Sequence, residues 1–155
     1  MSLMTRTEGA FLILRMCGAA VAIAIAATTV YAQSAAIGQR QQSMKAIAGA
    51  AKEPGAILKG QAPFDLGQVQ SSLKIYQQEG EKLKTLWPDD SKAGDHASMP
   101  EIWEKKAHFL GLLDKFVADS KAAETAITDE ATLKAEWPKV MRSCGGCHRE
   151  FRKPS

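Results

Sequence analysis

Two cysteines and a histidine stand close together near the end of the chain, in the segment Cys144-Gly145-Gly146-Cys147-His148. On a helix, residues three apart lie on one face, so both thiols would project from neighbouring positions. Two such thiols can form thioether bonds to the vinyl groups of a haem, and a neutral imidazole is a good axial ligand for its iron. The segment therefore predicts one covalently attached haem c, held by Cys144 and Cys147, with His148 as the proximal iron ligand.

Three other kinds of site fit these residues less well. A structural zinc ion needs four ligands, and the other two histidines, His96 and His108, lack metal-ligand spacing to a partner. A thioredoxin-like dithiol needs a βαβ setting, which the sequence does not offer. A disulfide between residues three apart on a helix would be strained.

The N-terminal residues 1–32 have the pattern of a cleavable signal peptide. Two arginines accompany a 14-residue apolar run at positions 17–30, and Val30-Tyr31-Ala32 supplies small residues for cleavage. That run is shorter than the ~20 residues that span a bilayer, although an uncleaved membrane anchor is the alternative. Export leaves residues 33–155 as the mature domain and predicts a bacterial periplasmic location, where paired cysteines are oxidised, metal-bound or alkylated.

The charge of the mature chain is nearly balanced. Without residues 1–32, the 20 basic and 17 acidic residues become 18 and 16, because Arg6, Arg15 and Glu8 are removed. Two haem propionates would bring the total close to neutral. This balance gives no reason to expect nucleic acid or an anionic membrane as a partner.

Helical spacing of apolar residues appears four times, and no strand-like alternation persists. The stretches are 37–51, ending near Pro54-Gly55; 66–87, capped by Asp65 and stopped by Pro88; 100–117, opening at Pro100; and the stretch that follows Thr128-Asp129 and reaches Phe151. Four amphipathic helices predict an all-α, antiparallel up-down-up-down bundle with its haem near the fourth helix. Pro138 lies inside the fourth stretch, so we expect a kink there, or a regular helix that begins only near Trp137.

The position of the haem motif distinguishes between classes of c-type cytochrome. A C-terminal motif in an all-helical exported chain resembles the class II c-type cytochromes, the cytochrome c′ family. The resemblance covers nearly all of the mature chain. It rests on Arg40-Gln41-Gln42-Ser43-Met44-Lys45, Pro100-Glu101-Ile102-Trp103 and the segment from Cys144 to Arg152.

The resemblance also implies what lies on the other side of the iron. In this family the residue four after the arginine of the first helix covers the distal face, and here it is Met44. The pattern is most similar to the low-spin branch in which methionine is the distal ligand, rather than to the five-coordinate, gas-binding branch. A thioether sulfur stabilises ferrous iron relative to a second histidine. Taken alone, the place of Met44 on an apolar stripe would favour an ordinary core position.

Two arginines belong to the haem environment by the same resemblance. Arg40 is expected beside a haem propionate, where a guanidinium forms a charge-assisted pair; a solvated arginine at a helix start is the alternative. Arg152, four residues after His148, is expected beside the proximal haem face. Family members often dimerise through their first two helices, and the residues here do not separate a homodimer from a monomer.

These features predict a non-enzymatic electron carrier that exchanges electrons with periplasmic redox proteins. The alternative is a five-coordinate cytochrome c′ that binds nitric oxide or carbon monoxide. A peroxidase ranks third, because its chemistry needs a distal acid–base residue and no histidine lies near Met44.

Overall fold

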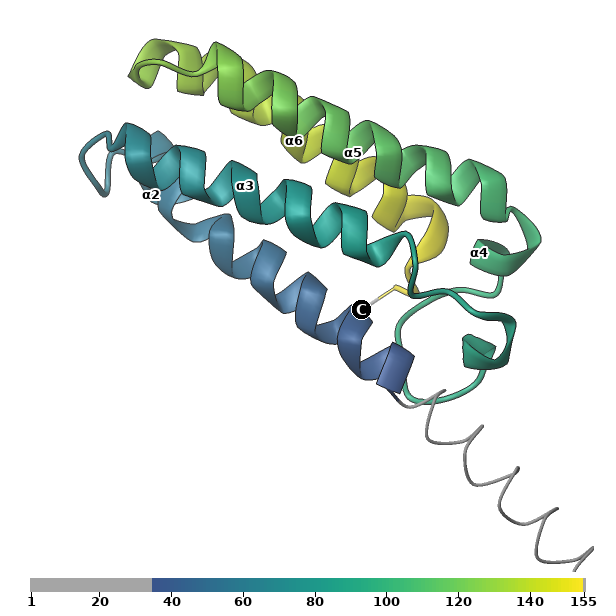
Figure 1. Cartoon of the computed structure of the whole chain (residues 1–155). Coiled ribbons are helices and arrows are strands. Elements are labelled where there is room, and N and C mark those ends of the chain that lie inside the picture. The colour runs from purple at the N-terminus through teal and green to yellow at the C-terminus, as the bar shows by residue number, and fades with distance from the viewer. Residues whose placement is uncertain (1–34, 155) are drawn as a thin grey trace, which may run out of the picture.

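The computed structural model describes residues 35–154, so the signal peptide expected at residues 1–32 lies outside the described residues. Four long helical segments pack side by side with alternating direction (Figure 1). In order, the elements are helical residues 35–50, α2 (Lys52–Leu58), α3 (Leu66–Leu83), the 3-10 turn η1 (Asp89–Lys92), α4 (Glu101–Glu104), α5 (Lys106–Ala126) and α6 (Glu130–Phe151). The expected all-α four-helix bundle is confirmed.

The two predicted N-terminal caps are present. The Asp65 carboxylate accepts a hydrogen bond from the Gln68 amide at 3.0 Å and starts α3. Asp129 accepts from the Thr132 amide at 2.8 Å, and the Thr132 hydroxyl accepts from the Asp129 amide in return. These reciprocal bonds satisfy amide groups that have no partner inside α6, so they fix where the last helix begins.

The first helix continues past its predicted end at Pro54-Gly55. After a turn at Ala51, α2 carries the chain on to Leu58, and the Ala51 and Gly55 amides still donate to carbonyls four residues earlier. Pro54 is the third residue of α2, and a first-turn residue needs no amide donor. The prediction of a helix end here is wrong for that reason.

Pro138 lies inside α6, and the kink expected there stays a prediction. The helix is continuous from Glu130 to Phe151, so the alternative in which its regular part begins near Trp137 is wrong. The third predicted helix is divided instead: α4 is a single turn, and Lys105 leaves helical geometry before α5 starts. The Trp103 indole donates to the Pro88 carbonyl at 3.0 Å, which holds that turn against the preceding loop.

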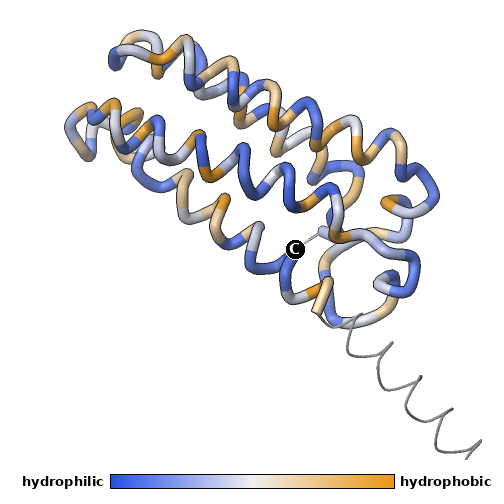
Figure 2. The backbone as a smooth tube through the Cα atoms, viewed as in Figure 1, coloured by the Kyte–Doolittle hydropathy of each residue, from blue (hydrophilic) through white to orange (hydrophobic). Residues whose placement is uncertain are grey.

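The buried side chains form two clusters along the bundle, and apolar segments recur along each helix (Figure 2). The first cluster joins α2, α3, α5 and α6 around Tyr76 and Trp137. The second lies toward the C-terminal end of α6 and contains Trp87, Trp103 and Phe151. Cys144 packs against the first cluster and Cys147 against the second, so the segment from Cys144 to His148 lies where the two clusters meet. Among the described residues, no helix has both the length and the apolar character needed to cross a bilayer.

Two glycines give a matched test of how closely α3 packs on α5. A Cβ added at Gly80 would lie 2.7 Å from Val117 Cγ2, whereas one added at Gly111 in α5 would meet nothing within 4 Å. We expect Gly80→Ala to lower the free energy of unfolding by about 1 to 3 kcal/mol through overpacking. Gly111→Ala should raise it by up to about 1 kcal/mol through helix propensity. Urea denaturation measures both changes, and equal effects of the two variants would contradict this packing.

Candidate haem site

Both motif cysteines are directed toward the protein interior. Cys144 packs against the first cluster and Cys147 against the second, and both are half-buried. Neither takes part in a disulfide. Burial raises the pKa of both thiols, that of Cys147 to about 11, so they are neutral thiols in apolar surroundings. Their position suits thioether formation, which replaces buried S–H groups with nonpolar bonds.

The His148 side chain is exposed beside these thiols. Within residues 35–154 no hydrogen bond engages its imidazole, so both ring nitrogens remain available to a ligand. Burial of part of the ring, followed by the nearby charge of Arg152, lowers its pKa. The neutral form favoured by this shift is the form that binds a metal. Nowhere in residues 35–154 do three His, Cys, Asp or Glu side chains gather as a metal site, so the zinc alternative gains no support.

Met44 lies across from the motif on the helical residues 35–50. Its half-buried side chain packs against the second cluster, the same cluster that Cys147 contacts. Ile47, one turn further along, contacts both clusters. The structure thus brings the first helix and the end of α6 to one apolar region, as the resemblance implied, and the ligand role of Met44 itself stays a prediction.

Arg40 is buried, with 4% of its surface exposed, so the alternative of a solvated arginine is wrong. Its guanidinium donates to the Leu86 carbonyl at 3.2 Å. It also donates to Ser91 Oγ at 2.9 Å and to the Ser91 carbonyl at 3.2 Å. It also lies 4.4 Å from the centre of the Trp87 ring. These contacts tie the first helix to the loop after α3, and their partners are 46 to 51 residues away in sequence.

Within residues 35–154, two buried N–H donors at this place have no acceptor. They are Arg40 Nε and Trp87 Nε1, and the guanidinium stacks directly on the Trp87 ring. No carboxylate in the described part of the chain pairs with Arg40, and burial lowers its pKa. Adjacent unpartnered donors and an uncompensated positive charge suit an anionic group. The residues present therefore fit a haem whose propionate approaches Arg40, and this role stays a prediction.

The comparisons with known proteins agree with this arrangement. A family model described as Cytochrome C′ matches residues 35–152. The chain belongs to the cytochrome c′ family. It is 44% identical over 122 residues to a cytochrome c′ of Rhodopseudomonas palustris, covering 78% of this chain and 84% of that one. It is also 32% identical over 136 residues to a cytochrome c-556 of the same organism, covering 84% of this chain and 91% of that one.

Solved structures support the same family. A cytochrome c′ from Rhodopseudomonas palustris superimposes with a TM-score of 0.76 at 43% identity, covering 77% of this chain and 97% of that chain. Membership of the cytochrome c′ family implies covalent haem c, and Cys144, Cys147 and His148 are the residues that would hold it. Relatives named cytochrome c′ and cytochrome c-556 both occur, so membership by itself does not choose between the two branches.

Arg152 ends α6 close to the expected proximal ligand. Its amide donates to the His148 carbonyl at 3.1 Å, and the side chain is exposed. The residues just after it pair with the loop before α4, where the Lys153 amide donates to the Ala97 carbonyl at 2.8 Å. This pairing fixes the end of the motif helix. The role of Arg152 beside a haem stays a prediction.

The remaining histidines and the exposed methionine take other positions. His108 Nε2 lies 2.9 Å from a Glu150 carboxylate oxygen on the surface, and His96 Nε2 lies 3.0 Å from the Lys92 carbonyl. Met141, one turn before Cys144, is 38% exposed. The part of the site missed from the sequence is the stack of Arg40 on Trp87, because neither residue carries a pattern that links it to the other.

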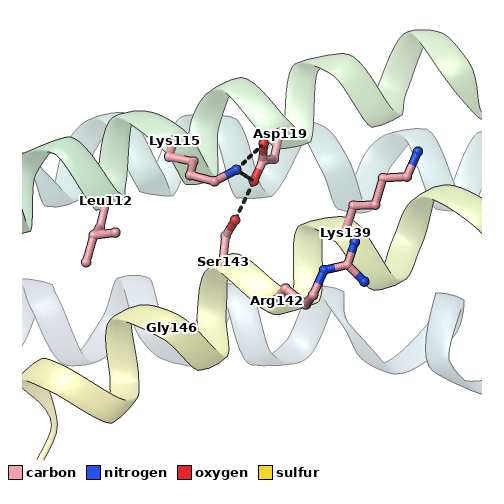
Figure 3. A pocket seen from close by; sticks show the side chains of 7 residues that line it. All are labelled: Leu112, Lys115, Asp119, Lys139, Arg142, Ser143 and Gly146. Carbon is pink, nitrogen blue, oxygen red and sulfur yellow. Dashed lines mark hydrogen bonds and ion pairs between the residues drawn. The ribbon is translucent and has the colours of Figure 1, made fainter.

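A groove of about 380 Å³ lies on the opposite side of α6, between α5 and α6 (Figure 3). Its lining consists of Leu112, Lys115, Asp119, Lys139, Arg142, Ser143 and Gly146, and contains neither cysteine nor His148. In Figure 3 the Asp119 carboxylate lies between Lys115 and Ser143 and bonds to both. This cluster joins the two helices and is separate from the haem site.

Asp119 should make stability depend on pH. Burial opposes its ionisation, but hydrogen bonds from Lys115 and Ser143 and the charges of Lys115 and Arg142 hold its pKa below the usual 3.8. Because the folded-state pKa is depressed, its stabilisation is complete above about pH 4 to 5 and is lost as pH falls through the folded value. We expect Asp119→Asn to lower the free energy of unfolding by roughly 1 to 2 kcal/mol at pH 7.

Denaturation of wild type and variant between pH 7 and about pH 2.5 measures this effect, and the difference should shrink toward acid pH. Asp114→Asn is the matched control, because Asp114 also bonds a lysine, Lys84, but is 63% exposed. A constant difference across the whole pH range would contradict this role of Asp119.

Proposed function

We propose that this chain is a periplasmic monohaem electron carrier with a low-spin, six-coordinate iron, His148 on the proximal side and Met44 on the distal side. One observation carries the proposal: Met44 is half-buried on the first helix against the same cluster as Cys147. A residue so placed is within the apolar region into which the attached cofactor must fit. Haem supplies the one-electron Fe(III)/Fe(II) couple when it is bound.

The protein's contribution is to position ligands and to shield the cofactor. The cysteines would fix the macrocycle to α6, and His148 follows them on the same helix. Arg40 anchors the first helix to the loop at Leu86 and Ser91, four residues before Met44, and so limits movement of the distal side chain. An iron that keeps six ligands in both oxidation states changes little in structure during electron transfer, which suits a carrier rather than an enzyme.

Location and partners follow from the same proposal. The signal-peptide pattern of residues 1–32 supports export to the bacterial periplasm, and the nearly balanced charge supports protein partners rather than nucleic acid. We expect those partners to be redox proteins of that compartment.

A gas-binding cytochrome c′ is the second candidate, favoured by the 44% identity to a protein of that name. Addition of carbon monoxide to the reduced protein distinguishes the two. The electron carrier should leave its absorption spectrum unchanged or respond only slowly and weakly, because a thioether must first leave the iron. Rapid, tight binding of carbon monoxide would favour the gas-binding function and reject Met44 as a firm ligand.

A further inference from the structure

One surface along the C-terminal part of α6, continued by Arg152 just after the helix ends, carries arginines that form no ion pair within residues 35–154. The arginine face, as we define it, consists of Met141, Arg142, Gly145, Arg149 and Arg152. Successive members lie mostly three or four residues apart, so the set follows one side of the helix. All five are exposed.

The arginines on this face differ from most of the lysines of the molecule. Nine lysines have a carboxylate oxygen within 4.0 Å, such as Lys74 with Glu124 and Lys134 with Glu130. Within residues 35–154, neither Arg142, Arg149 nor Arg152 forms such an ion pair. Their guanidinium groups are therefore able to pair with a partner's carboxylates, although the charge of Arg142 also acts on Asp119 across the groove between α5 and α6.

The same face has the composition of a protein interface. Met141 is an exposed large hydrophobic side chain, and it directly precedes Arg142 in the sequence. Methionine and arginine are both enriched where proteins meet. A Cβ added at Gly145 would meet nothing within 4 Å, so a partner can approach the backbone of the haem-attachment motif itself.

We propose that the arginine face is the docking surface for a redox protein that presents a cluster of carboxylates. This proposal rests on the electron-carrier function but not on the identity of the distal ligand. Arg142 and Arg149 are two helical turns apart, about 10 Å, which is close to the Debye length at moderate salt. At low ionic strength their fields add and attract an acidic surface toward the motif. A second copy of this chain would present the same charges and be repelled.

Oxidation of the reduced holoprotein by hexacyanoferrate(III) tests the attraction. One electron passes from the ferrous haem to the anionic oxidant, giving ferric haem and hexacyanoferrate(II). The mature protein is nearly neutral overall, so its net charge predicts little dependence of the rate on salt. The arginine face predicts a fall in the second-order rate constant of roughly tenfold between about 10 mM and 500 mM salt.

Charge reversal provides the matched comparison. Arg142→Glu with Arg149→Glu should abolish or invert this salt dependence. Lys74→Glu with Lys121→Glu makes the same change of net charge at exposed residues of α3 and α5. This control variant should retain most of the salt dependence of the rate constant. The proposal would be overturned if both double variants lost the salt dependence equally, or if the wild-type rate constant did not change with salt concentration. An unchanged absorption spectrum checks that each variant keeps its haem site.

Paramagnetic mapping gives a readout that does not depend on electron transfer. Hexacyanochromate(III), an inert anion, should broaden the NMR signals of residues 141–152 in the holoprotein, and the broadening should vanish in Arg142→Glu with Arg149→Glu. Broadening centred on residues 112–119 would assign the anion to the groove between α5 and α6 and contradict the proposal. Concentration-dependent broadening confined to residues 141–152 without the probe would indicate that a second copy of the chain occupies this face, and would contradict the proposal too.

The two proposals fail in different ways. A high-spin ferric spectrum would reject Met44 as a ligand and leave the mapping of the arginine face unaffected. A low-spin spectrum with no broadening at residues 141–152 would reject the docking surface alone.

Discussion

Met44→Leu should convert the low-spin protein into a high-spin one that binds carbon monoxide. Leucine has nearly the same volume as methionine, so packing against the second cluster changes little. It has no sulfur, however, and leaves the distal coordination position open. If the thioether leaves the iron in about 1% of wild-type molecules, its removal should strengthen carbon monoxide binding by roughly a hundredfold. Absorption spectroscopy and carbon monoxide titration of the reduced variant measure both changes.

Met141→Leu is the control for that substitution. Met141 is exposed on the motif helix, on the side from which it cannot oppose His148. We expect its spectrum and carbon monoxide affinity to match those of the wild type. If Met44→Leu also leaves the spectrum unchanged, Met44 is an ordinary core residue.

Loss of both motif cysteines should abolish covalent haem attachment. In Cys144→Ser with Cys147→Ser, no thioether can form, so haem staining of the protein on a denaturing gel should fall to background. Any haem that associates should be removed by extraction with acidified organic solvent. The single variant Cys147→Ser retains one thiol and should keep part of the stain.

Gly145→Ala is the matched control for the cysteine variants. It changes a residue between the two cysteines, where an added Cβ meets nothing within 4 Å. Its haem content should equal that of the wild type. Full covalent haem in the double cysteine variant would contradict the assignment of the attachment site.

The fold was largely predictable because its signals are local. Apolar stripes of helical period predicted the four helices, and Asp65 and Asp129 are short-range caps whose hydrogen bonds reach only three residues ahead. The errors were local as well. The Pro54-Gly55 pair predicts a helix end, but Pro54 lies in the first turn of α2, and that position depends on the turn at Ala51, which no residue pattern marks.

The candidate site was predictable only in part. Cys144, Cys147 and His148 form a contiguous motif, so their proximity follows from the sequence alone. The partners of Arg40 could not be inferred, because Leu86, Trp87 and Ser91 belong to a loop that returns to the first helix only after the bundle has folded. Such a contact depends on tertiary packing rather than on spacing. The position of Met44 came from family resemblance, and its cluster with Cys147 supports that placement.

The spin state of the purified ferric protein tests the central claim most directly. Optical and electron paramagnetic resonance spectra report whether a thioether sulfur occupies the sixth position. Ligation by His148 and Met44 predicts a low-spin signal together with a far-red sulfur-to-iron charge-transfer band. A high-spin signal without that band would contradict six-coordinate ligation and favour the gas-binding branch of the family.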